Sequence, residues 1–246
     1  MSVLKTLATA NRVLKQLKHD PRTLFLLFIV PSLLIVLLKY VFNGRPAAFN
    51  GLAPMLLGIF PMVMMFLITS IATLRERRSG TLDRLMTMPI SKLEFVLGYA
   101  IAFSVVALVQ AVITAFVMLA VLQVPVAGGA LATIVGAVLG ALLGTALGLF
   151  SSAFAATEFQ AVQFMPAFIL PQLLVCGLFV PRDQMAQVLQ WFADIMPLTY
   201  SVDAMQQVVM HTDWTPTHTK DLVVVLCFTV AALVLGSITI RRQEKP

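Results

Sequence analysis

Long runs of apolar residues separated by short polar segments are the dominant pattern of this chain. An α-helix needs about 20 mostly apolar residues to cross the hydrocarbon core of a bilayer. Six runs predict such spans, at residues 23–42, 54–74, 95–122, 131–154, 164–180 and 222–240. The fifth run is short and contains Pro166 and Pro171, which interrupt helical hydrogen bonding. The pattern predicts an all-α integral membrane protein with six transmembrane helices.

Composition agrees with a membrane protein and disagrees with a soluble one. Of the 246 residues, 59% are hydrophobic and 11% are charged, and the mean hydropathy is +0.94. A soluble domain carries about 25% charged residues. The first apolar run is as long as a span and no small-residue cleavage site follows it, so we expect no cleavable signal peptide. We expect residues 1–246 to form one membrane domain.

The distribution of Lys and Arg predicts the orientation. With six spans, both termini and two of the connecting loops lie on one side, which collects thirteen of the 17 basic residues. The other side holds only Lys39, Arg45, Arg182 and Lys220. Basic residues gather in cytoplasmic loops, so both termini are expected in the cytoplasm of a multi-pass cell-membrane protein. The net charge of +6 then reflects topology and contact with anionic lipids, and no nucleic-acid partner is needed to explain it.

Residues 1–22 have the spacing of an amphipathic helix that ends at Asp20-Pro21. Apolar residues recur at steps of three and four on one face, and basic residues occupy the opposite face. The apolar face comprises Val3, Leu7, Ala10, Leu14 and Leu17, and the basic face comprises Lys5, Arg12 and Lys15. We expect this helix to lie flat on the cytoplasmic leaflet, with its basic side chains toward lipid headgroups. A merely solvated helix is the alternative.

The most informative segment is the charged loop predicted at residues 75–94. Its charges exclude it from hydrocarbon, so it must face water, where a soluble partner can reach it. The residues that matter are Arg75, Glu76, Arg77, Arg78, Gly80, Thr81, Leu82, Asp83 and Leu85, followed by Pro89 and Gly98. They resemble the E-R-x-x-G-T-[LM] signature of type-2 ATP-binding-cassette (ABC-2) exporter permeases. The resemblance implies that the segment is the coupling helix, which docks on the ATPase subunit, and that the N-terminal helix is the interfacial connecting helix of that family.

The resemblance also implies the partners and the energy source. The family works as two permease subunits with two ATPase subunits, so we expect a homodimer or a heterodimer with a related permease. The chain has no G-x-x-x-x-G-K-[ST] motif and therefore no P-loop of its own. ATP and Mg²⁺ would be bound by the partner ATPase, and this chain would be a transport subunit without a catalytic, cofactor or metal site.

An uncharged interior rich in Met and Phe suits an amphipathic cargo, because flexible methionines repack around varied shapes. The chain has 13 Met and 17 Phe. The resembled family exports drugs, antibiotics, lipids and polysaccharides, and among these we expect an amphipathic drug or lipid. Candidate residues of the substrate path are Phe28, Met62, Phe66 and Phe103. Apolar residues of a bundle are more often packed inside it or turned to lipid.

Four glycines recur at steps of four in the fourth predicted span: Gly136, Gly140, Gly144 and Gly148. A stripe of small residues lets another helix approach to backbone contact. The sequence leaves two interpretations open, close packing inside one subunit and a contact that moves during transport.

Residues 181–219 are too polar to span the bilayer and too apolar for an ordinary loop. The spacing of apolar residues predicts two short helices, one stopped by Pro197 and one containing Tyr200 and Met205. Aromatic residues favour the membrane boundary, so we expect interfacial half-helices on the extracytoplasmic side. The resemblance implies re-entrant helices that form an outer gate before the last span. The alternative is a cap with no gating role.

Other chemistry is sparse. His211, Asp213 and His218 are the one group that suggests a metal, and without a further ligand at suitable spacing we interpret them as a solvated loop. No ionisable residue sits at the centre of a predicted span, which argues against an ion-coupled secondary transporter. A non-transport membrane protein, structural or lipid-modifying, is disfavoured by the lack of a reactive cluster.

Overall fold

The computed structural model describes residues 2–79 and 91–239, and within these residues it is helical with no β-strand. Five helices are long and apolar enough to cross a membrane. These are α2 (Pro21–Val41), α3 (Pro46–Arg78), α5 (Lys92–Phe116) with the π-helical turn η1 (Val117–Val121), α6 (Gly129–Ser152) and α10 (Pro216–Thr239). The predicted all-α membrane architecture is therefore confirmed.

The fifth predicted span corresponds to α7 (Glu158–Val175), which is not among these five helices. Its 18 residues include Pro166 and Pro171 inside the helix, and three Gln residues lower its hydropathy. The structure thus supports five spans by length and composition, with α7 as a shorter helix that packs against α3.

Local signals in the sequence explain where the helices begin. Asp20 caps α2 by accepting hydrogen bonds from the backbone N–H of Thr23 (3.2 Å) and from its hydroxyl (2.6 Å). Pro21 occupies the first turn, where its missing N–H costs nothing. Ser91 and Glu94 form a reciprocal capping box at the start of α5.

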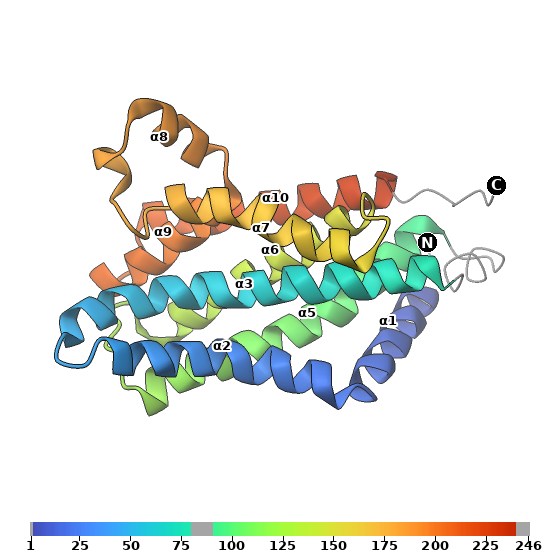
Figure 1. Cartoon of the computed structure of the whole chain (residues 1–246), viewed down its shortest axis with the longest axis horizontal. Helices are drawn as coiled ribbons and strands as arrows, with labels where there is room; N and C mark the ends of the chain where they lie inside the picture. The colour runs from blue at the N-terminus through green and yellow to red at the C-terminus, as the bar shows by residue number, and fades with distance from the viewer. Residues whose placement is uncertain (1, 80–90, 240–246) are drawn as a thin grey trace.

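The helices pack side by side along one long axis, as Figure 1 shows. The long helix α3 contacts α2, α5, α6 and α7, and α6 in turn contacts α5 and α10. The N-terminal helix α1 (Val3–Lys18) lies against α5 at the end of the bundle where α3 finishes. The short helices α8 (Gln187–Asp194) and α9 (Pro197–Met210) lie toward the opposite end.

The glycine stripe of α6 packs against helices of the same chain. A Cβ at Gly140 would lie 2.9 Å from the carbonyl oxygen of Gly58 in α3, and one at Gly148 would lie 2.5 Å from that of Phe66. At Gly144 it would collide with the backbone of Met62. The stripe therefore lies where α3 and α6 are in backbone contact within one chain, and a movement of this contact during transport stays a prediction.

The segment before the last span forms two short helices, at the positions that the sequence pattern predicts. α9 is packed into the bundle with Leu198, Val202 and Met205 fully buried, whereas α8 exposes Trp191. Arg182, in the short 3-10 helix η2 (Arg182–Gln184), donates to the Asp203 carboxylate at 2.8 Å and so holds the segment to α9. Its membrane position and a gating role stay predictions.

The interpretation of His218 as a solvated loop residue was wrong. It lies in the first turn of α10, it is buried, and its Nδ1 is 3.1 Å from the carbonyl oxygen of Ala204. His211 and Asp213 are exposed as predicted. Among the described residues, no group of three or more His, Cys, Asp or Glu is arranged to hold a metal.

Candidate functional site

The charged residues Arg75, Glu76, Arg77 and Arg78 form the last turn of α3. The prediction of a loop that begins at residue 75 was therefore wrong for these four, which continue the helix beyond its apolar part. Basic residues are favourable there because the carbonyl end of a helix carries partial negative charge. The other coupling candidates, Gly80, Thr81, Leu82, Asp83 and Leu85, lie outside the described residues.

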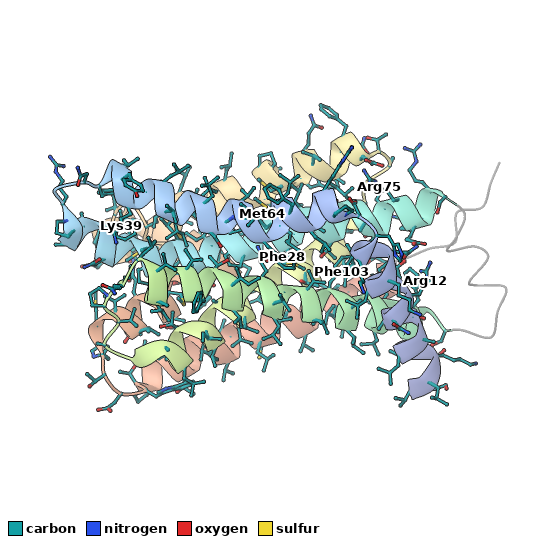
Figure 2. The ribbon with its side chains drawn as sticks, turned by 90° about the horizontal axis from the view of Figure 1, so that it is seen from below. Arg12, Phe28, Lys39, Met64, Arg75 and Phe103 are labelled. Carbon is teal, nitrogen blue, oxygen red and sulfur yellow. The ribbon has the colours of Figure 1, made fainter. Side chains whose placement is uncertain are left out.

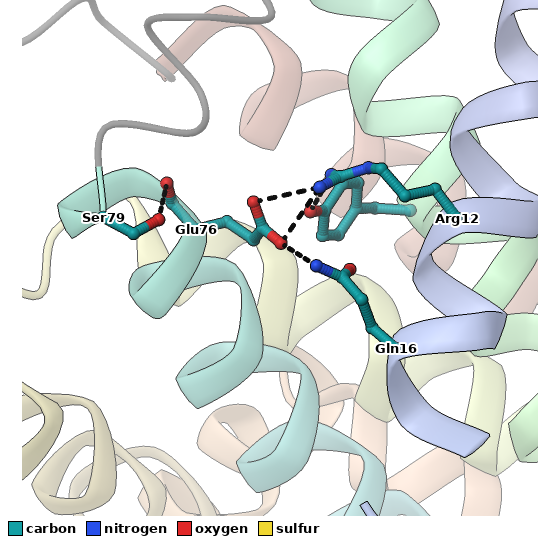
Figure 3. Close-up of polar contacts among 5 residues, drawn as sticks. Arg12, Gln16, Glu76 and Ser79 are labelled. Atoms are coloured by element: carbon teal, nitrogen blue, oxygen red, sulfur yellow. Dashed lines mark hydrogen bonds and ion pairs between the residues drawn. The ribbon is translucent and has the colours of Figure 1, made fainter. Parts of the chain in front are cut away.

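Glu76 is the centre of a polar cluster that joins three helices (Figure 3). Its carboxylate lies 3.3 Å from Nη1 of Arg12 and accepts a 2.9 Å hydrogen bond from Nε2 of Gln16, both on α1. Nη2 of Arg12 donates to the hydroxyl of Tyr99 on α5 at 2.7 Å. The Glu76 side chain is 12% exposed. We call Arg12, Gln16, Glu76 and Tyr99 the Glu76 cluster.

The neighbouring arginines join the end of α3 to two more helices. Nε and Nη2 of Arg75 donate to the two carboxylate oxygens of Glu158, at 2.9 and 3.0 Å, at the start of α7. These hydrogen bonds lower the pKa of Glu158 below its ordinary value. Arg77 donates from Nη1 to the backbone carbonyl of Ser152, at the end of α6. Arg78 is exposed.

The helix α1 is held against α5 along its length. The backbone N–H of Ser2 donates to Oε1 of Glu94 at 2.6 Å. Thr9 lies so close to Gly98 that a Cβ there would be 2.6 Å from the Cβ of Thr9, so only glycine permits this approach. Thr6 and Thr9, with Ala10 and Val13, form the buried face of α1.

The helix α1 exists where the sequence predicts it, but one of its basic residues lies elsewhere than expected. Arg12, predicted to face lipid headgroups, points into the bundle and reaches Glu76, whereas Val3 and Leu7 are exposed. The position of α1 on the membrane stays a prediction. Arg12, Gln16 and Tyr99 were not predicted as site residues from the sequence. A usable signal was present, because residues 12 and 16 are four apart and therefore share one face of a helix.

The predicted path residues fall in different surroundings. Met62 and Phe66 are fully buried, and their backbones lie against glycines of α6. Phe28 is partly buried and packs against the hydrophobic core. Phe103 is also buried, but it lines a cavity of about 610 Å³ between α1, α2, α3 and α5, to which Glu76 and Arg75 contribute. Figure 2 shows Arg12 and Arg75 at one end of the bundle and Lys39 at the other.

The site therefore consists of the end of α3, held to α1 and α5 through Glu76, to α6 through Arg77 and to α7 through Arg75. The last turn of α3 is thus tied by polar side chains to four neighbouring helices.

Several curated proteins are similar to this chain, among them the following three. The probable multidrug ABC transporter permease YbhR of Escherichia coli (strain K12) is 28% identical over 157 residues, which are 64% of this chain and 43% of that protein. The inner membrane transport permease YhhJ of the same strain is 28% identical over 168 residues, 68% of this chain and 44% of that protein. ABC transporter G family member 20 of Dictyostelium discoideum is 24% identical over 168 residues, which are 68% of this chain and 23% of that protein.

The matched part of the chain spans less than half the length of each of these relatives. The family model described as ABC-2 type transporter matches residues 5–210, a range that contains most of α1, the charged end of α3 and the glycine stripe of α6. By this match over most of its length, the chain belongs to the ABC-2 type transporter family of membrane permeases.

Proposed function

We propose that this chain is the transmembrane permease subunit of an ATP-driven exporter, which moves an amphipathic drug or lipid out of the cytoplasm or the inner leaflet. A separate ATPase subunit would bind ATP and Mg²⁺ and act on residues 75–94. The observation that carries the proposal is the attachment of the last turn of α3 to α1, α5, α6 and α7 through Glu76, Arg77 and Arg75. A partner that shifts this end of α3 shifts the helices around it.

The cargo class rests on two supports. Two of the similar proteins are named as probable multidrug ABC transporter permeases, YbhR and YbhS of Escherichia coli. The interior of this chain is apolar with few charges, which suits molecules that partition into a membrane.

The assembly we propose has two permease subunits and two ATPase subunits, with α7 as the sixth span of each permease. Both termini of the permease lie in the cytoplasm, and α8 and α9 lie at the outer face. In support, α1, the end of α3 and the end of α10 all lie at one end of the bundle, with α8 at the other (Figure 1). Among the described residues, that end also holds nine of the thirteen Lys and Arg residues.

The proposal predicts how ATP hydrolysis depends on the complex. The full chain should be reconstituted in proteoliposomes with a candidate ABC ATPase subunit from the same organism. We expect hydrolysis only when the ATPase is present, because the permease has no P-loop. We also expect export of a membrane-permeant dye that requires ATP. The control is an ATPase variant without its Walker A lysine. Dye export without ATP, driven by an imposed ion gradient, would contradict the proposal.

The orientation is tested by single cysteines in a background where Cys176 and Cys227 are alanine. Ser79 and Thr217 are exposed at opposite ends of the bundle, so Ser79→Cys and Thr217→Cys report on the two sides. In intact cells we expect a membrane-impermeant maleimide to label residue 217 and to label residue 79 only after permeabilisation. Labelling of both positions in intact cells is incompatible with cytoplasmic termini.

A further inference from the structure

The cavity beside the Glu76 cluster has the size and the wall chemistry of a ligand site. It measures about 610 Å³ and lies between α2 and α3, with α1 and α5 closing its sides. Sites for small molecules are commonly about 300–1,000 Å³ and are mostly apolar, with a few polar groups that orient the ligand. Figure 2 shows Met64, Phe103 and Arg75 in this part of the bundle.

The wall of the cavity is apolar along the helices and polar at one end. Leu26 and Val30 of α2 face Met64 and Ile68 of α3 across the apolar part. The polar end is formed by Gln16, Asp20, Thr23, Arg75, Glu76 and Ser79. A molecule that fills this space therefore needs an apolar body and one polar end.

The charges at the polar end favour a positive group on that molecule. Two carboxylates, of Asp20 and Glu76, and one guanidinium, of Arg75, line the cavity. Glu158 binds the Arg75 guanidinium with both carboxylate oxygens, and Arg12 pairs with Glu76. Asp20 accepts hydrogen bonds from the backbone and hydroxyl of Thr23 and is attracted by the charge of Arg75, but Glu158 already occupies the Arg75 guanidinium, and within the described residues no basic side chain forms an ion pair with Asp20.

The cavity is open to the surface of the bundle at α2. Leu26 lines it and is 55% exposed, so the cavity reaches the outer face of this helix. That face belongs to a candidate membrane span of which only 22% is buried in the protein. An amphipathic molecule dissolved in the membrane can therefore enter sideways, without passing through water.

We propose that this cavity binds an organic cation with a bulky apolar body, its positive group beside Asp20 and its body between α2 and α3. The inference rests on the proposed function in one respect only, which is that the bound cation would be a cargo of the exporter. Binding itself is a property of this chain. The main competing occupant is the acyl chain of an anionic lipid, with its headgroup near Arg22, next to the mouth of the cavity.

The test uses two probes of the same shape and opposite charge, tetraphenylphosphonium and tetraphenylborate. The full chain is placed in nanodiscs of phosphatidylcholine, and saturable binding is measured against empty nanodiscs. We expect saturable binding of the cation and none of the anion. Asp20→Asn should weaken binding of the cation about tenfold, since a close carboxylate contributes at least about 1.4 kcal/mol at the effective dielectric constant of such a site. Asparagine still caps α2, so the helix is kept.

Matched variants distinguish binding in the cavity from general effects of a substitution on the protein. Leu26→Trp should abolish saturable binding by filling the mouth, whereas Leu37→Trp, also exposed on α2 but outside the cavity, should leave it unchanged. Asp213→Asn removes an exposed carboxylate elsewhere in the fold and should have no effect. Equal binding of both probes, or an unchanged affinity in Asp20→Asn, would overturn the cation site in favour of a lipid chain. Absence of saturable binding would overturn it outright.

The outcomes also distinguish this inference from the proposed function. The binding assay contains no ATPase. Binding of the cation without ATP-dependent export would therefore contradict the exporter proposal and still support the cation site. Export of the dye without binding of the cation would leave the exporter proposal and remove the site.

Discussion

Replacing Gly144 by alanine is expected to destabilise the protein by about 3 kcal/mol, the upper part of the range for overpacking. A Cβ at this position collides with the backbone of Met62 in α3, which includes the carbonyl oxygen and Cα. Backbone atoms cannot move aside as the end of a flexible side chain can, so α3 and α6 must separate. The measurement is the midpoint of thermal unfolding in detergent, followed by size-exclusion chromatography of the heated protein.

Two other glycines provide the controls. Gly51 in α3 has no atom within 4 Å of the position of its missing Cβ, so Gly51→Ala should be neutral or stabilising by up to about 1 kcal/mol through helix propensity. A Cβ at Gly136 meets the sulfur of Met205 at 2.6 Å, which a methionine side chain can relieve, so Gly136→Ala should lie between the two. Equal midpoints for Gly144→Ala and Gly51→Ala would show that the stripe is not a packing contact.

The long helices could be predicted from the sequence because their cause is local. A run of about 20 apolar residues has one stable form in a bilayer, since every backbone polar group must be satisfied within the segment. The ends of the helices were harder to predict. α3 extends to Arg78, past the predicted boundary at residue 74, because arginine side chains stabilise the carbonyl end of a helix and can leave the apolar region.

The partners of the candidate residues could not be predicted because they are set by tertiary packing. The motif around Glu76 was visible, but nothing in the sequence pairs position 76 with Arg12, which is 64 residues away. The apolar periodicity of α1 located the helix but did not indicate the face that packs against α5. The small side chains of Thr6 and Thr9 permit the contact with Gly98. A prediction based on hydrophobicity gives threonine less weight than leucine and therefore overlooks this face.

The glycine stripe is a second case in which the sequence predicts a contact but not the partner of that contact. Its spacing predicted a close helix contact, which the structure confirms, but a repeat of four small residues does not identify the second helix. The partner is α3 along most of the stripe and the side chain of Met205 in α9 at Gly136.

The last prediction distinguishes two roles of Glu76, an internal tie between α1 and α3 and a direct contact with the ATPase. Glu76→Arg alone should lower permease-dependent ATP hydrolysis at least about tenfold, because it places two guanidiniums together where an ion pair stood. Breaking a buried pair costs about 3–5 kcal/mol, and the 29% exposure of Arg12 reduces this to about 2 kcal/mol. The protein should therefore still insert and elute as a folded species.

The double variant Arg12→Glu with Glu76→Arg restores opposite charges in the same place. Gln16 and Tyr99 tolerate the exchange, since an amide and a phenol each donate and accept hydrogen bonds. If the cluster acts by holding α1 to α3, the double variant should recover most of the hydrolysis that the single variant loses. The matched control is the exposed pair Arg75–Glu158, with side chains 61% and 49% exposed, whose reversal should cost less than about 1 kcal/mol. A double variant as inactive as Glu76→Arg would instead assign Glu76 to the surface that the ATPase contacts.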